Sequence, residues 1–503
     1  MAVDSVIVVG AGISGLTAAA LLGKHGIPVT LLEAHSQTGG CAGTFKRGDY
    51  VFDVGATQVA GLEHGGIHER IFRYLQLSLP EAHLLEIACL VDLNDRTEPV
   101  RLWHDPQKWD QERKKQFPGS ESFWYLCKLI HESNWAFSSR SPVVPIGNVW
   151  DFVQLLKAVR FDNSISALFA RSSVVDLLKL CKCDKNERLK RFLDMQLKLY
   201  SQEPAHRTAA LYGATVMQIA QAPLGLWHLN GSMQSLSNLL LKAFNSFGGE
   251  LFLRHRVVRL ENCVRDQEWR VITKEPGGGE LIFNAKDVVF SLPPQCLKRL
   301  MPLDSVMLRS YRNRLDDLSE PSGAIVFYGA INRTALPKDC PAHLQLASSE
   351  LDSLFVSISF DGDGRAPLGQ ATVVASIFTK TKDWFDISQN VYQQRKVKIH
   401  IAIRKRLERF FCCSDNAWLH QELSTPRSFA KWTGRPKGIV GGLGQHPSNF
   451  GPFGLSSRTP MNGLWLCGDS MYPGEGTAGV SHSSVTVVRQ LLANRGMDWS
   501  LPK

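Results

Sequence analysis

Short apolar runs and glycine-rich turns alternate at the start of the chain. Val6–Val9 is a run of four apolar residues that leads into Gly10-Ala11-Gly12-Ile13-Ser14-Gly15, a G-x-G-x-x-G pattern. An Ala- and Leu-rich stretch that ends at Lys24 predicts a helix, and residues 28–32 predict a second strand closed by Glu33. This order of strand, glycine turn, helix, strand and acidic residue predicts a dinucleotide-binding βαβ unit.

The residues of this unit have distinct expected roles. Gly10 permits the tight turn, Gly12 lets the backbone approach a pyrophosphate, and Gly15 lets the helix pack closely on the strand. The N-terminus of the helix offers free N–H groups and a partial positive charge to the phosphates. Glu33 follows Gly15 by 18 residues, where a carboxylate can accept hydrogen bonds from ribose hydroxyls. The predicted cofactor contacts here are Gly10, Gly12, Ile13, Ser14, Gly15 and Glu33.

Two glycine-rich segments follow the βαβ unit, and a third lies near the C-terminus. Residues 35–44 read HSQTGGCAGT, and residues 50–57 read YVFDVGAT. Near the other end, an apolar strand at 463–467 leads into a Gly-Asp pair, and residues 472–480 precede a predicted helix of small residues. Glycine lets the backbone lie against a flat or charged ligand, although each segment alone is also typical of a flexible surface loop.

The motifs GGCAGT (39–44), FDVGAT (52–57) and YPGEGTAGV (472–480) resemble the FAD-dependent phytoene desaturase and carotenoid isomerase family of the amine oxidase superfamily. This resemblance implies an α/β fold in which a Rossmann-like FAD-binding domain with a parallel sheet is interleaved with a mixed α+β substrate domain. It implies FAD as the cofactor and no separate nicotinamide site, and it directs the N-terminus of the last helix toward the flavin. The cofactor contacts that it adds are Gly39, Gly40, Val257, Gly468, Asp469, Gly479 and Val480.

The sequence departs from this family beside the Gly-Gly pair, where many members carry arginines. Thr38 and Cys41 stand there, and Lys46 and Arg47 follow a few residues later. We therefore expect backbone N–H groups to provide more of the phosphate binding. An amine oxidase would be expected to place several aromatic rings around the flavin. Because Tyr472 is the one aromatic residue of the C-terminal motif, the sequence argues against an amine oxidase.

The chain is expected to leave and re-enter the FAD-binding domain. Three segments, 1–70, 241–300 and 441–503, are predicted to form that domain. The segments 71–240 and 301–440 are predicted to form the substrate domain, and the first of these also faces a membrane. The middle FAD-binding segment carries alternating apolar and polar residues separated by turn residues, which predict a series of short strands.

The substrate domain is expected to contain a sheet and an apolar wall. Residues 322–328 and 371–378 predict two of its strands. Residues 208–241 contain no Lys, Arg, Asp or Glu, which is unusual in a basic chain. Such a stretch is most often buried core, and it is equally suited to the wall of a tunnel for a long hydrocarbon. The two interpretations are compatible.

Charge and composition restrict the partners. The chain has 57 Lys and Arg against 47 Asp and Glu, a formal charge of +10, but no nucleic-acid-binding motif. Residues 179–198 and 395–411 are rich in Lys and Arg beside apolar residues, so each is either a membrane-facing amphipathic segment or a solvated helix face. We expect peripheral attachment on the cytoplasmic side of a membrane. The 11 cysteines are scattered, which predicts free thiols and no metal site.

The resemblance implies a function in carotenoid chemistry. It predicts a carotenoid desaturase that forms a C=C bond by hydride transfer to the flavin, with oxygen or quinone as the electron acceptor. A carotenoid cis-trans isomerase, a polyene or retinoid saturase and a non-catalytic flavin-binding scaffold are the alternatives. No catalytic triad or paired carboxylate identifies a catalytic residue. Glu475 and His228 are possible proton acceptors, and both can equally be structural.

Overall fold

The central feature of the fold is a five-stranded parallel sheet. The computed structural model describes residues 4–503 except 264, 266, 302–308, 319 and 320. The strands follow the order β10-β2-β1-β14-β20, and every neighbouring pair is parallel. They are β1 (Val6–Val9), β2 (Val29–Leu32), β10 (Glu250–Phe252), β14 (Asp287–Phe290) and β20 (Leu464–Leu466). Three distant parts of the chain therefore build one sheet, which confirms the predicted α/β fold with interleaved parts.

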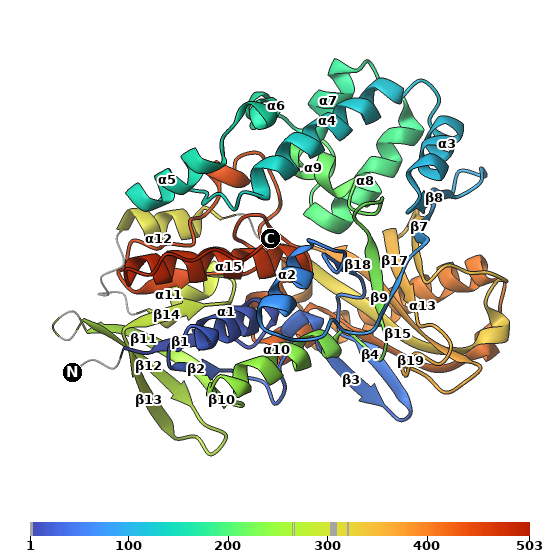
Figure 1. Cartoon of the computed structure of the whole chain (residues 1–503). Helices are drawn as coiled ribbons and strands as arrows, with labels where there is room; N and C mark the ends of the chain where they lie inside the picture. Colours follow the sequence, from blue (N-terminus) through green and yellow to red (C-terminus); the bar gives the residue numbers. More distant parts are fainter. Residues whose placement is uncertain (1–3, 264, 266, 302–308, 319–320) are drawn as a thin grey trace.

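Both faces of this sheet are covered (Figure 1). Val6 and Val8 of β1 pack toward the helices α1 (Ile13–Lys24), α10 (Gln234–Ser246) and α15 (Gly476–Asn494). Ile7 and Val9 pack on the opposite face against an antiparallel meander. Its strands are β11 (Arg256–Cys263), β12 (Glu268–Lys274) and β13 (Glu280–Ala285). Since β1 is buried on both faces, its four residues are all apolar.

A seven-stranded sheet forms the base of the predicted substrate domain, in the order β19-β15-β18-β17-β16-β7-β8. Its strands are β7 (Ile87–Asp92), β8 (Val100–Trp103), β15 (Gly323–Asn332), β16 (His343–Ser348), β17 (Asp352–Ile358), β18 (Gln370–Thr379) and β19 (Trp418–Ser424). The two strands expected from the sequence at 322–328 and 371–378 correspond to β15 and β18, which pair antiparallel over their whole length.

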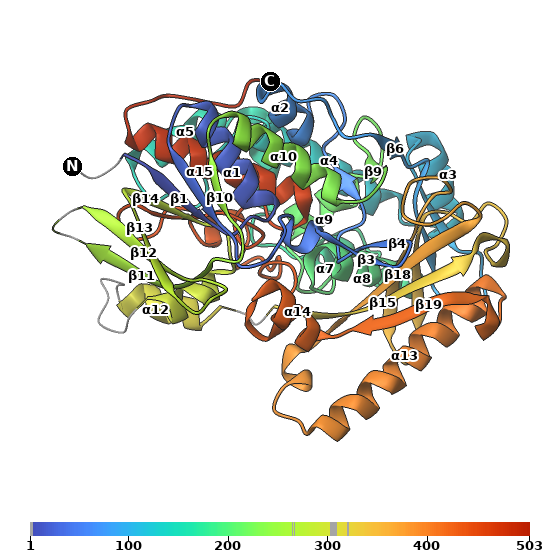
Figure 2. The ribbon, with the colours of Figure 1, turned by 90° about the horizontal axis from the view of Figure 1, so that it is seen from below.

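The long helix α13 (Gln389–Phe411) runs along one face of this sheet (Figure 2). Ile403 and Leu407 are fully buried in the core that α13 shares with the sheet. The apolar side of the basic segment 395–411 is therefore used within the protein. Its charged residues form the outer side of a helix that covers a sheet.

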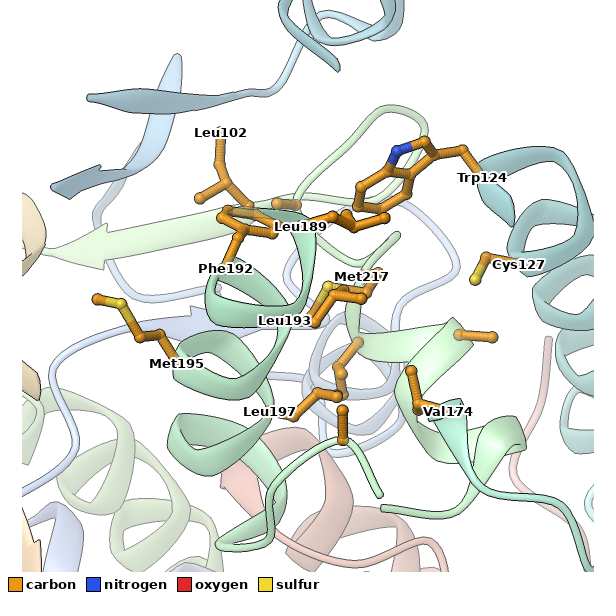
Figure 3. Close-up of a cluster of buried hydrophobic side chains, with 14 of the residues drawn as sticks. Leu102, Trp124, Cys127, Val174, Leu189, Phe192, Leu193, Met195, Leu197 and Met217 are labelled. Carbon is orange, nitrogen blue, oxygen red and sulfur yellow. The ribbon is translucent and has the colours of Figure 1, made fainter. Parts of the chain in front are cut away.

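A layer of helices encloses the other large core. These helices are α3 (Pro106–Gln116), α4 (Glu121–Ser138), α7 (Val174–Leu180), α8 (Glu187–Ser201) and α9 (Ala210–Val216). One side of α8 carries the buried residues Leu189, Phe192, Leu193 and Leu197 (Figure 3). The Lys and Arg residues of 179–198 include several that form ion pairs on its outer side, namely Arg188 with Asp95, Lys190 with Glu187 and Lys198 with Asp352.

The remaining elements are short. The helices are α2 (Ile67–Tyr74), α5 (Val149–Ala158), α6 (Ser164–Leu168), α11 (Leu297–Leu300), α12 (Arg309–Asp316) and α14 (Pro426–Thr433). The strands are β3 (Thr44–Arg47), β4 (Tyr50–Asp53), β5 (Val59–Ala60), β6 (Ala82–Leu84) and β9 (Leu226–Leu229). Among the described residues, no helix has the length and apolar character needed to span a bilayer. The boundaries drawn between the two domains in the sequence stay a prediction.

A buried cluster of charged side chains connects the two domains. The guanidinium of Arg365 donates to Asp53 Oδ2 from Nη2 at 3.0 Å and to Asp363 Oδ2 from Nη1 at 2.8 Å. His228 Nε2 lies 3.1 Å from the same oxygen of Asp363, and the backbone N–H of Met233 donates to Asp53 Oδ1 at 2.8 Å. Burial raises the pKa of Asp53, although the charge of Arg365 acts in the opposite direction. Asp53 belongs to the FDVGAT segment (52–57), and Arg365 follows β17 of the seven-stranded sheet. The cluster therefore holds this segment against that sheet.

We predict that Arg365→Met lowers the free energy of unfolding by about 3–5 kcal/mol, because it leaves two buried carboxylates without their cation. Thermal unfolding followed by circular dichroism would measure the change. Arg259→Met is the control, since Arg259 is a half-exposed residue in an ion pair with Glu261 on the surface. Equal losses in the two variants would contradict a special role for the buried cluster.

Candidate functional site

One large cavity, of about 950 Å³, runs from the glycine turn of the βαβ unit into the helical layer. It lies beyond the carboxyl ends of the parallel strands, where ligands of open α/β sheets bind. Of the 13 cofactor contacts expected from the sequence, 12 line this cavity. They are Gly10, Gly12, Ile13, Ser14, Glu33, Gly39, Gly40, Val257, Gly468, Asp469, Gly479 and Val480. The structure brings them together, and their individual roles in binding stay predictions.

The glycine turn has the close contacts that its motif predicts. Gly10 has a φ of +99°, a conformation that favours glycine. Gly15 lies behind the turn, outside the cavity lining, and a Cβ there would come within 1.8 Å of the Gly10 carbonyl oxygen. A Cβ on Gly12 would meet no protein atom within 4 Å. Gly15 therefore serves the packing of α1 on β1, whereas Gly12 leaves open space for a ligand.

Glu33 is oriented by backbone hydrogen bonds. The N–H of Ala11 donates to its Oε2 at 2.7 Å, and the N–H of His35 donates to its Oε1 at 2.8 Å. Each carboxylate oxygen has a second acceptor position. The carboxylate is thus fixed at the cavity wall with acceptor capacity for ribose hydroxyls.

The Gly-Gly pair contacts the glycine turn directly. The N–H of Gly39 donates to the carbonyl of Ala11 at 2.8 Å, and Gly39 and Gly12 form an isolated parallel bridge. A Cβ on Gly40 would lie 3.2 Å from the Cα of Gly12. The segment with Gly39 and Gly40 is therefore an ordered part of the structure and not a flexible surface loop. It forms a second wall of the cavity beside the glycine turn, where the pyrophosphate is expected.

Val257 lies at an irregularity of β11. The pairing of β11 with β12 shifts register between Val257 and Arg259, so that Val258 has no partner residue opposite. Such a bulge turns backbone groups away from the ladder. Since Val257 and Val258 both line the cavity, their backbone is available to a ligand there, as the family resemblance implies for the adenine.

Sequence reasoning missed the cations of this cavity. Arg435, Arg256 and Arg299 all line it, although none adjoins the Gly-Gly pair in the sequence. Arg435 Nη2 lies 2.7 Å from Asp469 Oδ2, and Arg435 Nη1 donates to the carbonyl of Gly441 at 2.9 Å. The one local signal was the position of Arg435 in the segment GRPKG (434–438), which is rich in glycine and proline. The positive charge on the cavity wall therefore comes from residues distant from the Gly-Gly pair in the sequence, and Asp469 orients one of them.

Glu475 precedes α15 and lines the same cavity. Gln202 Nε2 donates to Glu475 Oε1 at 2.5 Å. The other end of the Gln202 amide accepts from the backbone N–H of Ser322 at 2.9 Å, which fixes the orientation of the amide. Burial, followed by the nearby charge of Asp469, raises the pKa of Glu475 well above its usual value. The environment of Glu475 thus favours the protonated form of its carboxyl group. His228, by contrast, is part of the buried ion cluster.

The far end of the cavity is apolar and aromatic. The rings of Tyr212 and Phe450 have centroids 5.6 Å apart, and Phe450 and Tyr472 are also 5.6 Å apart. Tyr472 is therefore accompanied by aromatic residues that its motif alone did not reveal. The uncharged stretch 208–241 supplies both core residues, such as Met217, and cavity-lining residues. Those that line the cavity are Tyr212, Thr215, Val216, Ile219, Leu224, Gly225 and Leu226.

These features fit FAD. The glycine turn at the start of α1 and the nearby arginines suit a pyrophosphate, and the carboxylate of Glu33 suits an adenosine ribose. The N-terminal end of α15, with Gly479 and Val480, suits the electron-rich edge of a flavin ring. The apolar end then remains for a second, apolar molecule.

Comparison with known sequences agrees with this geometry. A family model for the NAD(P)-binding Rossmann-like domain matches residues 8–75. The chain is 23% identical to chloroplastic prolycopene isomerase from Daucus carota, over 99% of this chain and 81% of that protein. It is 28% identical to all-trans-retinol 13,14-reductase from Rattus norvegicus, over 42% of this chain and 35% of that protein. The domain name refers to NAD(P), which shares its ADP half with FAD.

Solved structures share the fold over almost the whole chain. Putrescine oxidase bound to putrescine superimposes with a TM-score of 0.65 at 18% identity, covering 98% of both chains. Cyclohexylamine oxidase from Brevibacterium oxydans superimposes with a TM-score of 0.60 at 15% identity, covering 97% and 99% of the two chains. These likenesses concern the fold.

Together, the sequence comparisons confirm the resemblance to the carotenoid desaturase and isomerase family, and the solved structures confirm the fold. They also support FAD as the cofactor and a FAD-dependent oxidoreductase or isomerase as the class of enzyme. The type of reaction is not distinguished at this level, because relatives of more than one type are found.

We predict that Gly12→Ala and Gly15→Ala act in different ways. Gly12→Ala keeps the unfolding temperature of the FAD-free protein but weakens FAD binding at least tenfold, because its methyl group projects into ligand space. Gly15→Ala lowers the unfolding temperature of the FAD-free protein, because its methyl group collides with the turn. Flavin absorbance per chain, titration with FAD and thermal unfolding measure these effects. Unaltered FAD affinity in Gly12→Ala would contradict the placement of the pyrophosphate.

Proposed function

We propose that this chain is an FAD-dependent enzyme that acts on the C=C bonds of a long apolar polyene of the carotenoid class. The observation that carries the proposal is a single cavity with a cofactor-type end and an apolar, aromatic end. A hydrocarbon chain in the apolar end would lie in the same cavity as the flavin. The whole-length similarity to prolycopene isomerases supports the same class of substrate.

Within this class, cis-trans isomerisation is the reaction that we propose, and the environment of Glu475 supports it. When bound, FAD supplies the reversible two-electron chemistry of the site. The chain itself contributes the carboxyl group of Glu475, which lines the same cavity as the aromatic residues Tyr212 and Tyr472. A conjugated hydrocarbon can be protonated only at carbon. An uncharged carboxyl group is a proton donor that is compatible with an apolar cavity.

The proton can be followed through the reaction. The O–H bond of Glu475 breaks, a C–H bond forms on the polyene, and the cation spreads over the conjugated chain. The former double bond then has single-bond character and rotates. The proton returns to Glu475, whose carboxylate is unfavourable while buried near Asp469. Substrate and product have the same mass, and no electron acceptor is consumed.

Desaturation is the second candidate, and it rests on the resemblance of the terminal motifs to carotenoid desaturases. The same cavity would place a saturated C–C bond at the flavin end. This reaction needs a proton acceptor and an electron acceptor, oxygen or quinone. The direction of the pKa shift of Glu475 is in keeping with isomerisation, because burial disfavours the carboxylate that would accept a proton.

The test is to incubate the FAD-loaded protein with vesicles that contain a poly-cis carotenoid or a more saturated carotenoid precursor. The products are separated by chromatography with mass detection. We expect altered retention at unchanged mass. A loss of two hydrogens would establish desaturation, and a gain of two hydrogens would establish saturation. Oxidation of putrescine or cyclohexylamine with no change in any polyene would overturn the proposal.

We predict that Glu475→Gln lowers turnover by about 10²–10⁴-fold, the usual range for loss of a general acid, while FAD binding is retained. In the unmodified protein, turnover falls as the pH rises through the pKa of Glu475, because the acid is lost. The contribution of Glu475 to the free energy of unfolding also decreases as the pH rises. It is fully present below the ordinary value of 4.5 and is lost as the pH rises through the raised pKa of the folded protein.

A pH–rate profile of the two proteins makes this comparison. Glu475→Gln should remove the loss of rate at high pH along with most of the rate. If the variant keeps full activity with an unaltered profile, Glu475 is not the proton donor. Gln202→Leu is a companion variant, because it removes the hydrogen bond to Glu475 and leaves the carboxyl group in place.

A further inference from the structure

Exposed apolar side chains are concentrated on one surface of the helical layer. Of the 23 large hydrophobic residues that are exposed in the described structure, eight fall within residues 146–168. Phe161 is 100% exposed, and Val149 and Leu168 are each 78% exposed. We call this surface the α5–α6 face. It comprises Ile146, Val149, Phe152, Val153, Leu156, Val159, Phe161 and Leu168. In Figure 1 α5 and α6 lie along the upper edge of the molecule.

The helix α5 has the reverse of the usual polarity. Its buried residues include Asp151, which accepts from Gln490 Nε2 at 3.1 Å and lies 3.3 Å from Arg458 Nε. Gln154 is also buried and accepts from Arg489 at 3.0 Å. A surface helix in water normally buries its apolar side and exposes its polar side. The side of α5 that faces away from the protein is therefore the apolar one, and it is suited to an apolar environment.

Cations border the α5–α6 face. Lys157, Arg160 and Arg171 are exposed, and in the described part of the chain none of them forms an ion pair. The exposed acid on this segment, Asp162, is paired with Arg140. An apolar surface bordered by unpaired cations complements an anionic lipid bilayer, whose headgroups attract Lys and Arg while its interior accepts apolar side chains.

The α5–α6 face adjoins the cavity. Asn134, Trp135 and Ser139, at the end of α4, line the cavity, and Trp135 is itself exposed. The helix α6 is attached to this part of α4, because the hydroxyl groups of Ser133 and Ser166 lie 2.9 Å apart. The exposed apolar surface on α5 and α6 and the exposed wall of the cavity on α4 therefore lie on neighbouring helices.

We propose that the α5–α6 face docks the protein on an anionic lipid bilayer, so that a polyene moves between the bilayer and the cavity beside α4. The identity of the molecule that moves between the bilayer and the cavity rests on the proposed function, whereas the docking of the protein does not. The two basic segments expected from the sequence, 179–198 and 395–411, offer fewer exposed apolar residues, because α8 and α13 bury most of theirs. Those that are exposed there are Leu180, Val397 and Ile401. The inserted residues are those of α5 and of the turn at Phe161.

Vesicle binding by the full-length, FAD-loaded protein tests this proposal. The vesicles contain phosphatidylcholine alone or phosphatidylcholine with phosphatidylglycerol, and binding is measured by co-sedimentation. The test variant is Leu156→Glu with Phe161→Glu. The matched control is Leu281→Glu with Ile282→Glu, which alters two exposed apolar residues on β13. Lys157→Gln with Arg160→Gln tests the role of charge.

We expect the unmodified protein and the β13 control to bind anionic vesicles, with binding reduced at high salt. The Leu156/Phe161 variant should bind at least tenfold more weakly, with unchanged flavin content and unfolding temperature. The Lys157/Arg160 variant should lose binding to anionic vesicles and keep its weak binding to neutral ones. Equal binding by the Leu156/Phe161 variant and the unmodified protein would overturn the proposal. So would a face that holds two copies of the chain together, shown by a dimer that this variant converts to a monomer.

Failure of the proposed function would be recognisable separately. Substrate dispersed in detergent bypasses the bilayer, so the Leu156/Phe161 variant should then turn over as fast as the unmodified protein. If no polyene is converted in either format while vesicle binding follows the α5–α6 face, the proposed reaction is wrong and the docking surface stands.

Discussion

The close contact between the start of α1 and the end of β1 determines the arrangement of the site. Only a hydrogen atom fits between Gly15 and the carbonyl of Gly10, so the helix begins directly above the strand. The last helix, α15, is then placed against α1 by small polar residues. Ser484 Oγ donates to the carbonyl of Ser14 at 2.8 Å, and Ser483 Oγ accepts from the N–H of Gly468 at 2.9 Å. Two helix N-termini from opposite ends of the chain therefore face one cavity, where their dipoles favour the negatively charged parts of a ligand.

The cofactor end and the apolar end of the cavity must also keep a fixed position relative to one another, although they belong to different sheets. Long-range polar contacts do this at several positions. Gln202, just after α8, bonds both to Glu475 beside α15 and to the backbone at Ser322, which leads into β15. One amide group thus connects the helical layer, the C-terminal flavin segment and the substrate sheet. The half-buried position of Gln202 adds to the cost of losing these hydrogen bonds.

The sequence predicted what local pattern determines. The βαβ unit, the meander strands from β11 to β13 and the last strand and helix all follow from apolar runs bounded by glycine, and their positions agree with the structure to within a few residues. The parts that could not be predicted depend on contacts between distant residues. Arg435 joins the cavity through Asp469, and Phe450 meets Tyr472, although nothing in either local sequence points to the partner.

The amphipathic segments illustrate a second limit. Periodicity shows that a helix has an apolar side, but it does not show which way that side faces. In α13 most of the apolar side faces a sheet, whereas in α5 it faces outward, although each helix combines an apolar side with a polar one. The direction is decided by buried partners such as Arg458 and Arg489, which attract the polar side of α5 inward and come from the far end of the chain.

The buried cluster around Arg365 also restricts how this sequence can diverge. Asp53, Asp363 and Arg365 compensate one another's charge, so a change at any one of them leaves the others buried and uncompensated. A single substitution at any of these three positions is therefore expected to be destabilising. The three positions are expected to vary together among related chains. An alignment of close relatives would then show linked substitutions between the cofactor loop and a residue more than three hundred positions away.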